Sequence, residues 1–215
     1  MFKNLIYDIN SIKERDPAAR TSLEVFFVYS GLHAVIYHRI AHWFFKHKMF
    51  FIARMISQNA RFLTGIEIHP GATIGKGLLI DHGSGVVIGE TAVVGDNCTI
   101  YQGVTLGGTG KHTGKRHPTI GNNVMIGSGA KVLGPFKVGD NSKVAANAVV
   151  LNEIPPNSTC VGVPAHIVKR DNIKVARAKI DLDQIHIPDP VSMEICALRS
   201  DVDKMKECLS KKESE

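Results

Sequence analysis

The sequence contains few cysteines, and their spacing excludes two classes of site. Cys98, Cys160, Cys196 and Cys208 form no C-x-x-C pair, so neither a zinc knuckle nor a disulfide framework is expected. We expect a reduced, cytoplasmic protein, because the N-terminal segment has no long apolar run of the kind found in a signal peptide. Charged residues interrupt every apolar stretch before it reaches about 20 residues, so no membrane helix is expected.

The excess of positive over negative charge is also small. The formal net charge is +6 on 215 residues, and no basic run alternates with aromatic residues as it would in a nucleic-acid groove. This charge permits an anionic ligand but does not require one, since a solvated basic surface explains it equally well. Apolar residues make up 44% of the chain, which is too many for a disordered protein, so a folded core is expected.

Aromatic residues nearly disappear after Phe62, where only Tyr101 and Phe136 follow. Glycine shows the opposite distribution, with 19 of its 20 residues between positions 65 and 162. Aromatic residues fill bulky cores, whereas glycine permits tight turns, so two architectures are expected to meet near residue 64. Apolar residues at steps of three and four predict an α-helical domain over 1–64, with a helix beginning at Asp16-Pro17.

An aliphatic residue recurs every six positions beyond residue 66, and glycine often follows it. The column consists of Ile68, Ile74, Ile80, Ile88, Val94, Ile100, Leu106, Ile120, Ile126, Val132, Val138, Val144 and Val150. This hexapeptide repeat predicts a parallel β-helix over 65–168, in which three units complete one triangular coil and the column fills a little over four coils. The glycine after each aliphatic residue is expected at the tight corner, and Cys98 is expected to pack in the core.

The repeat is interrupted twice, and both interruptions contain histidine. Two extra residues lie between Ile80 and Ile88, in the segment that contains His82. Between Leu106 and Ile120, a polar, glycine-rich segment adds either two or eight residues, depending on whether it hides a strand. Because the loops of a regular scaffold commonly carry its function, these two segments are the candidate sites.

Several side chains in and near the interruptions could support catalysis. A carboxylate beside a histidine makes it a better general base, and Glu67 and His82 are about one coil apart, so they are expected near one corner. Arg116 and His117 could hold a carboxylate, because arginine offers a bidentate fork and histidine a second donor. A surface contact or a solvated loop charge would explain these residues equally well.

The end of the chain, residues 169–215, is predicted to be a basic tail followed by a helix. Pro188-Asp189-Pro190 is a helix entry, and an a/d heptad seam follows it at Val191, Ile195, Leu198, Val202, Met205 and Leu209. This helix could join subunits or could pack on its own solenoid.

Several segments resemble the serine O-acetyltransferase family. They are ERDPAAR at 14–20, GIEIHPGA at 65–72, IDHGSGVVIGE at 80–90, GVTLGGTGK at 103–111, GKRHPTIG at 114–121 and GVPA at 162–165. The resemblance implies an α+β chain with an N-terminal α-helical region, a left-handed parallel β-helix and a C-terminal helix. It also implies acetyl transfer from acetyl-CoA, a co-substrate, to the hydroxyl of L-serine, without a metal. The products would be O-acetyl-L-serine and CoA, in the first step of cysteine biosynthesis from serine.

The resemblance also implies residue roles. His82 matches the general base, and Glu67 matches its acidic partner. The residues that match the serine-binding set are Asp16 and Asp81, for the ammonium, and Arg116 and His117, for the carboxylate. The residues that match the CoA-binding set, at an edge between two subunits, are Gly108, Ser128, Lys143 and Ala146.

Family features further imply the partners. A homotrimer is expected, because only about 15 residues precede Asp16-Pro17, where the longer form has the extra helical region that supports a hexamer. L-Cysteine is expected as a feedback inhibitor that competes with serine. A complex with O-acetylserine sulfhydrylase is doubtful, since the chain ends in Glu215 and lacks the C-terminal isoleucine used for docking.

Three alternatives remain at this point. The first is an O-acetyltransferase of the same fold that acts on a sugar or antibiotic hydroxyl, which would not need Asp16, Asp81 and the Arg116-His117 pair. The second is a γ-type carbonic anhydrase, because His112 and His117 have the H-x4-H spacing of its zinc ligands. The third is a scaffold without activity, against which the two histidine-bearing interruptions argue.

Overall fold

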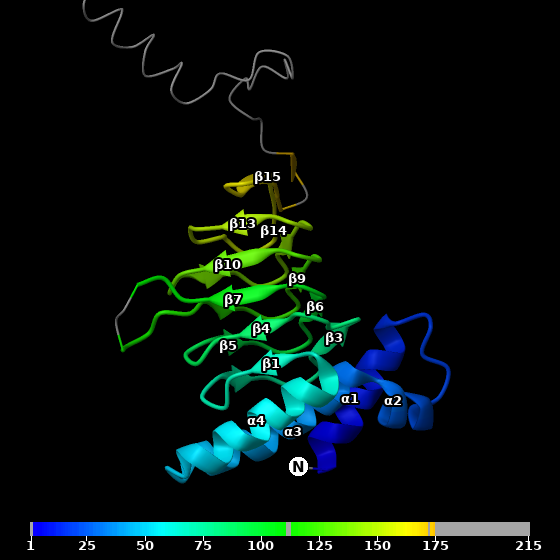
Figure 1. Cartoon of the computed structure of the whole chain (residues 1–215). Helices are drawn as coiled ribbons and strands as arrows, with labels where there is room; N and C mark the ends of the chain where they lie inside the picture. The colour runs from blue at the N-terminus through cyan, green and yellow to red at the C-terminus, as the bar shows by residue number, and fades with distance from the viewer. Residues whose placement is uncertain (1, 111–112, 172, 175–215) are drawn as a thin grey trace, which may run out of the picture. The chain divides into compact units, whose positions relative to one another are not determined.

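The computed structural model describes residues 2–110, 113–171 and 173–174. Four helices come first, α1 (Phe2–Arg15), α2 (Ser22–Val28), α3 (Ser30–Lys46) and α4 (Phe50–Thr64), and short strands follow them. Figure 1 shows the helices packed at one end of a stack of coils. The predicted fold class, a helical region followed by a parallel β-helix, is confirmed, while the predicted C-terminal helix and its heptad seam lie outside the described residues.

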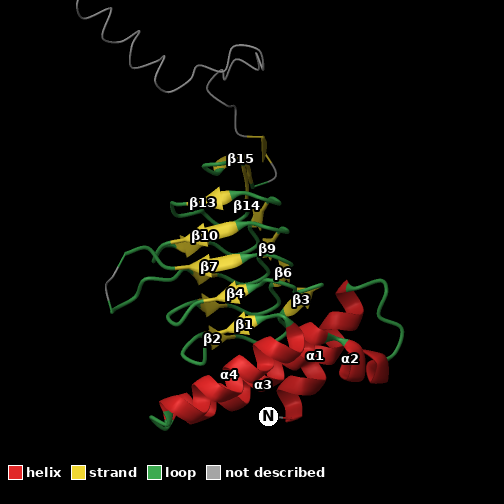
Figure 2. Ribbon diagram, viewed as in Figure 1, coloured by secondary structure: helices red, strands yellow, loops and turns green. Residues whose placement is uncertain are grey.

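Three parallel sheets form the sides of the solenoid (Figure 2). The first sheet contains β1 (Glu67–Ile68), β4 (Val87–Ile88), β7 (Thr105–Gly107), β10 (Lys131–Leu133) and β13 (Val149–Val150). The second contains β2 (Thr73–Ile74), β5 (Val93–Val94), β8 (Thr119–Ile120) and β11 (Lys137–Val138). The third contains β3 (Leu79–Asp81), β6 (Thr99–Tyr101), β9 (Met125–Ile126), β12 (Lys143–Val144) and β14 (Ser158–Val161), followed by antiparallel β15 (His166–Arg170) and β16 (Ile173–Lys174).

The solenoid has about five coils, where the repeat count gave a little over four. The additional coil begins at β13, passes a parallel bridge between Val138 and Ile154, and ends in β14. Its spacing departs from six residues, which hid it from the repeat count. The long interruption joins β7 in the first sheet directly to β8 in the second, and its described residues contain no strand. It therefore adds eight residues, and its described parts project from the side of the stack (Figure 1).

The aliphatic column forms the interior of the β-helix, as predicted. Ile100, Leu106, Ile126 and Val144 are each fully buried. Cys98 lies in the same core, where its thiol donates a hydrogen bond of 3.0 Å to the carbonyl of Gly121 and burial raises its pKa to about 11. It is thus a packing residue and not a reactive thiolate.

Each glycine that follows a residue of the aliphatic column lies at a corner, where it is needed for close approach between coils. The glycines after the aliphatic residues do not adopt left-handed backbone conformations. They allow consecutive coils to approach each other, since a Cβ at Gly127 would lie only 2.6 Å from the backbone nitrogen of Ala146. These glycines lie at the ends of the strands, where the corners begin, and the left-handed conformations of the turns belong to other residues.

The turns between the sheets stack into three edges. We call them the His82 edge (third to first sheet: 82–86, 102–103, 128–129, 146–147), the Arg116 edge (first to second sheet: 89–92, 108–110 and 113–118, 134–136) and the Asn edge (second to third sheet). Left-handed Asn97, Asn123, Asn141 and Asn157, with φ of 54–58°, lie on the Asn edge. The amide of Asn141 accepts from Asn123 at 3.2 Å and donates to Asn157 at 3.0 Å. Asn157 in turn donates to Asp171 at 3.0 Å, so a side-chain ladder runs along this edge from Asn123 to Asp171.

The helical region differs from the predictions in two respects. Asp16-Pro17 lies in a turn after α1, and α2 begins later, with Thr21 as its N-cap accepting from the backbone N–H of Glu24. Many aromatic residues are on the surface instead of in a core, such as Phe51, 77% exposed, and Phe62, 86% exposed. Within the described ranges, no helix combines the length and apolar character that a membrane span requires.

Candidate active site

A cavity of about 330 Å³ lies where the helical region meets the first coil. The residues that line it are Asp16, Ala18, Val28, Tyr29, Ser30, Gly31, Ile80, Asp81 and His82. Helix α3 approaches β3 so closely that a Cβ at Gly31 would lie 2.3 Å from the carbonyl oxygen of Ile80. This close packing brings Asp16 to the same cavity as Asp81 and His82, from about 65 residues away in the sequence.

His82 is presented by a tight left-handed turn. His82 and Gly83 have φ of 58° and 66°, and the backbone N–H of Gly83 donates to the carbonyl of Asp81 at 2.7 Å. The turn directs the imidazole outward, with 75% of the side chain exposed, and its Nε2 lies 3.9 Å from Oδ1 of Asp81. The imidazole is accessible to a substrate and has a carboxylate nearby, as a general base requires.

The carboxylate of Asp16 is held on both oxygens. Oδ1 accepts the backbone N–H of Ala18 at 2.8 Å, and Oδ2 accepts the hydroxyl of Tyr29 at 2.7 Å. Burial, together with this hydrogen bond to Asp16, raises the pKa of Tyr29 to about 12, so its hydroxyl remains a donor at neutral pH. Asp16 and Asp81 therefore line the cavity with two carboxylates, which favours a cationic group such as an ammonium.

Glu67 has a different partner from the one expected. Its Oε2 forms an ion pair of 3.1 Å with Nη1 of Arg61 on α4, and within the described residues no ion pair joins it to His82. Among the described residues, the only carboxylate within 4 Å of the His82 imidazole is that of Asp81. Glu67 and His82 lie near one edge as predicted, but their side chains do not pair.

Arg116 and His117 belong to a second cluster, on the Arg116 edge. The guanidinium of Arg116 pairs with the carboxylate of Glu90, and this hydrogen bond lowers the pKa of Glu90. His117 is 8% exposed, and its Nδ1 lies 2.9 Å from Oγ1 of Thr91. Burial, and then the Arg116 cation, hold the pKa of His117 below its usual value, so the imidazole is neutral at pH 7.

The two clusters lie on different edges of one chain. His82 follows β3, at the junction of the third and first sheets, whereas Glu90 and the Arg116-His117 pair occupy the junction of the first and second sheets. The cavity lining contains His82 but neither Arg116 nor His117. One chain therefore brings together only part of the predicted serine-binding set.

The predicted CoA-binding residues divide in the same way. Ser128 and Ala146 lie on the His82 edge in consecutive coils, since the N–H of Asn147 donates to the carbonyl of Ser128 at 2.8 Å. Lys143 lies exposed on β12 just before this edge. Gly108 lies on the Arg116 edge, where a Cβ would be 3.0 Å from Cγ of Arg116.

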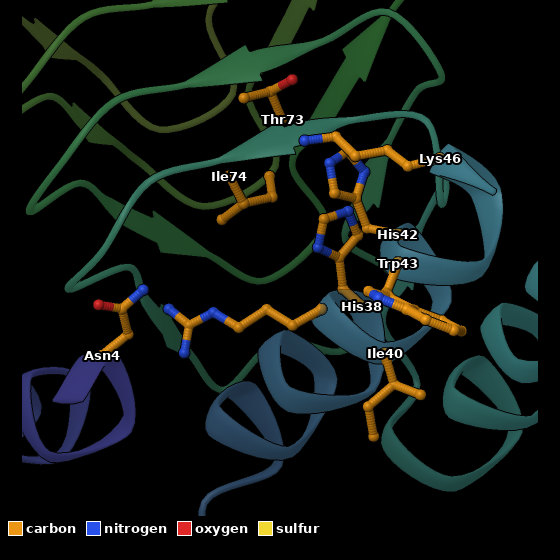
Figure 3. Close-up of a pocket in the computed structure, with 9 residues that line it drawn as sticks. Asn4, His38, Ile40, His42, Trp43, Lys46, Thr73 and Ile74 are labelled. Atoms are coloured by element: carbon orange, nitrogen blue, oxygen red, sulfur yellow. The ribbon is translucent and has the colours of Figure 1, made fainter. Parts of the chain in front are cut away.

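A larger cavity of about 690 Å³ lies between α3 and β2 and contains none of the predicted site residues (Figure 3). His38 and His42 stack there with ring centroids 5.5 Å apart. The nitrogens of His38 form no hydrogen bond of normal geometry, and burial lowers its pKa to about 3. The carbonyls of Ala72 and His69 partly offset this shift. Volume alone therefore does not identify the active site.

Sequence reasoning missed Tyr29, Arg61 and Thr91, each of which contacts a predicted site residue. Thr91 directly follows the IDHGSGVVIGE segment, so extension of that segment by one residue would have included it. Tyr29 and Arg61 reach their partners only through the packing of the helices against the solenoid, and no sequence signal marks them.

Two family models match the repeats. One, described as bacterial transferase hexapeptide (six repeats), matches residues 117–152, and another, hexapeptide repeat of succinyl-transferase, matches residues 85–108. A parallel β-helix of hexapeptide repeats with an exposed histidine in a carboxylate-lined cavity defines the class of hexapeptide-repeat acyltransferases.

Curated relatives identify the family within that class. Serine acetyltransferase of Staphylococcus aureus strain Mu50 is 56% identical over 95% of this chain and 94% of its own length. Serine acetyltransferase of Bacillus pumilus is 52% identical over 100% and 99%. The chain belongs to the serine acetyltransferase family. The sugar or antibiotic acetyltransferase alternative is not favoured.

Solved structures agree. Serine acetyltransferase from Brucella abortus in complex with coenzyme A has a TM-score of 0.77 and 45% identity, covering 79% of this chain and 68% of that one. The soybean enzyme complexed with serine has a TM-score of 0.75 and 44% identity, covering 77% and 68%. A serine acetyltransferase in complex with cysteine has a TM-score of 0.77 and 41% identity, covering 79% and 66%.

Proposed function

We propose that this chain transfers the acetyl group of acetyl-CoA to the hydroxyl of L-serine, with His82 as the general base. The observation that carries the assignment is the cavity in which an exposed imidazole lies beside two carboxylates, Asp16 and Asp81. O-Acetyl-L-serine and CoA are the products, so the enzyme acts in the synthesis of cysteine from serine.

The cavity residues account for the proton movements of this reaction. His82 removes the proton of the serine hydroxyl as the oxygen attacks the thioester carbonyl carbon, because a neutral hydroxyl is a poor nucleophile. When the tetrahedral intermediate collapses, the carbon–sulfur bond breaks and the imidazolium returns the proton to the CoA sulfur. Glu67 supports His82 as its acidic partner, which requires that it leave or share its contact with Arg61.

Substrate recognition requires two edges. Asp16 and Asp81 bind the serine ammonium, while Arg116 and His117 bind its carboxylate through charge-assisted hydrogen bonds. Since these groups lie on different edges of one chain, the complete site forms between two copies, with the His82 edge of one facing the Arg116 edge of another. A cyclic homotrimer pairs every such edge. Ser128, Lys143 and Ala146 lie on or beside the His82 edge, whereas Gly108 lies on the Arg116 edge. This arrangement supports a CoA site at the same interface.

Inhibition by cysteine, the cellular location and the domain boundaries are proposed from the serine acetyltransferase family. L-Cysteine shares the ammonium and carboxylate of serine and competes for its site, which agrees with the related structure that contains cysteine. The enzyme acts in the cytoplasm. The chain divides into a helical domain at 1–64, the β-helix at 65–168 and a tail at 169–215.

A thiol-release assay with L-serine and acetyl-CoA tests the function. We expect CoA release that depends on serine and is not supported by sugars or aminoglycosides. The His82→Ala variant should lose about two to four orders of magnitude in rate, the usual contribution of a general base. Near-wild-type turnover of that variant would reject His82 as the base, and release driven by a sugar alone would reject the substrate.

A further inference from the structure

We propose that Thr91 is a positioning residue for the substrate carboxylate, because it fixes the tautomer of His117 and anchors the Arg116-His117 peptide. This inference rests on the proposed function of the site. No contact of Thr91 with substrate is required, since it acts through its two neighbours on the Arg116 edge.

The hydroxyl of Thr91 uses its full hydrogen-bonding capacity on this segment. Oγ1 accepts the backbone N–H of Arg116 and the backbone N–H of His117, each at 3.1 Å. It also lies 2.9 Å from Nδ1 of the His117 ring. A hydroxyl has two acceptor lone pairs and one proton, so once both lone pairs are occupied its proton is directed to Nδ1.

A second contact fixes the direction of that hydrogen bond. The backbone N–H of Thr91 points to the same ring atom, with a nitrogen–nitrogen distance of 3.2 Å. A backbone N–H can only donate, so Nδ1 must be an unprotonated acceptor. The neutral His117 ring consequently carries its proton on Nε2. The ring lies close to Gly89, where a Cβ would be 2.0 Å from Cδ2 and 2.1 Å from Nε2.

The main chain of Thr91 anchors the same segment. Its carbonyl accepts a hydrogen bond of 2.7 Å from Nζ of Lys115. Thr91 is itself held in a turn, in which the N–H of Ala92 donates to the carbonyl of Gly89 at 3.1 Å. The end of the long loop is thus attached to a rigid corner of the solenoid, and the carboxylate-binding donors do not have to be ordered when substrate binds.

Two substitutions separate the hydroxyl from the shape of the side chain. Thr91→Val keeps the volume but removes three hydrogen bonds, whereas Thr91→Ser keeps the hydroxyl. We expect the KM for serine to rise about ten- to a hundredfold in Thr91→Val and to stay within about threefold of wild type in Thr91→Ser. The KM for acetyl-CoA should not change. Thr73→Val is the matched control, because Thr73 is exposed on β2 and its side chain forms no hydrogen bond within the described residues.

A spectroscopic measurement on the wild type does not depend on any variant folding. In ¹⁵N-histidine-labelled enzyme, long-range proton–nitrogen correlation should show His117 as the Nε2–H tautomer, with the signal assigned by its loss in His117→Gln. Thr91→Val should weaken this preference. Wild-type His117 protonated on Nδ1, or an unchanged KM for serine in Thr91→Val, would overturn the inference. Failure of the wild type to acetylate serine would instead reject the proposed function and leave the tautomer measurement valid.

Discussion

Arg61 and Glu67 form an ion pair of 3.1 Å that joins helix α4 to the first strand of the solenoid. The Glu67 carboxylate, which was expected beside His82, is instead bound by Arg61 on helix α4. Because Arg61 is 58% exposed and Glu67 22%, the pair contributes little to folding, about 0–1 kcal/mol as for other surface pairs. Its relevance is to the proposed mechanism, in which Glu67 supports His82, because Arg61 would then compete with His82 for the Glu67 carboxylate.

Replacement of Arg61 should therefore not impair catalysis, whereas replacement of Glu67 should. We expect Arg61→Gln to retain or raise kcat, because Glu67 is then free to approach His82. Glu67→Gln should lower kcat about ten- to a hundredfold, within the range of a general base and its support. Steady-state kinetics and urea unfolding of both variants check this. A large loss of kcat in Arg61→Gln, at unchanged stability, would mean that the ion pair itself supports the active geometry.

Inactive variants should complement each other if two chains form each site. His82→Ala and Arg116→Ala each disable one edge, so neither variant should be active on its own. Co-expression in equal amounts should restore about a quarter of the sites, since half of the chains supply each intact edge at random. Serine-dependent CoA release by the co-purified mixture measures this. Absence of activity in verified mixed oligomers would place the whole site within one chain.

Acid stability should depend on His38. Its pKa is about 3 in the folded chain, below its ordinary value near 6.5, because the ring is buried. The unfolded chain binds the proton more readily, so this contribution is complete above about pH 6.5 and declines as the pH falls towards 3, by at most about 1.4 kcal/mol per pH unit. Urea unfolding from pH 7 to 4 should show a shallower pH dependence for His38→Leu.

The exposed His47→Gln variant is the control for this measurement. It should change the slope less than His38→Leu does, because the His47 side chain is exposed. His69 and His117, whose pKa values burial also lowers, contribute equally to all three proteins and cancel in the comparison. Equal slopes for His38→Leu and wild type would show that the folded protein already accommodates a charged His38.

The free energy of unfolding should depend on both the side chain and the left-handed backbone of Asn141 on the Asn edge. Asn141→Gly retains the left-handed backbone but loses two ladder hydrogen bonds, so we expect a loss of about 1 kcal/mol. Asn141→Ala loses the same bonds and must also adopt φ near 58°, which costs about 1–2 kcal/mol more. Denaturant unfolding measures both. The exposed Asn152→Ala should be neutral, and equal losses for the glycine and alanine variants would contradict the role of the backbone conformation.

The sequence predicts those parts of this protein that depend on local repetition. Ile100 and Ile126 occupy equivalent positions in successive coils, so a six-residue period is sufficient to place both in the core. His82 is predictable for the same reason, because it interrupts that period. The fifth coil was missed where the spacing to Ile154 departs from six.

Contacts between the helices and the solenoid were not predictable in the same way. The pairing of Tyr29 with Asp16 and of Arg61 with Glu67 depends on how α3 and α4 pack against the first coil, which no local pattern encodes. The division of the site between two edges follows from strand order. Since β3, β4 and β5 belong to three different sheets, His82 and Glu90 lie on different edges.

Because the turns on the His82 edge are stacked, the distances between residues along this edge are fixed. Ala146 lies three coils from His82, and stacked strands are about 4.8 Å apart, so the separation along the edge is about 14 Å. It can change only by a whole coil, because a shift of one residue would turn the aliphatic column out of the core. Deletion of one 18-residue coil would leave His82 intact but shorten the distance from His82 to Ala146 by about 5 Å. In the proposed CoA site, which contains Ser128 and Ala146, the length of the thioester donor would therefore be matched to a whole number of coils.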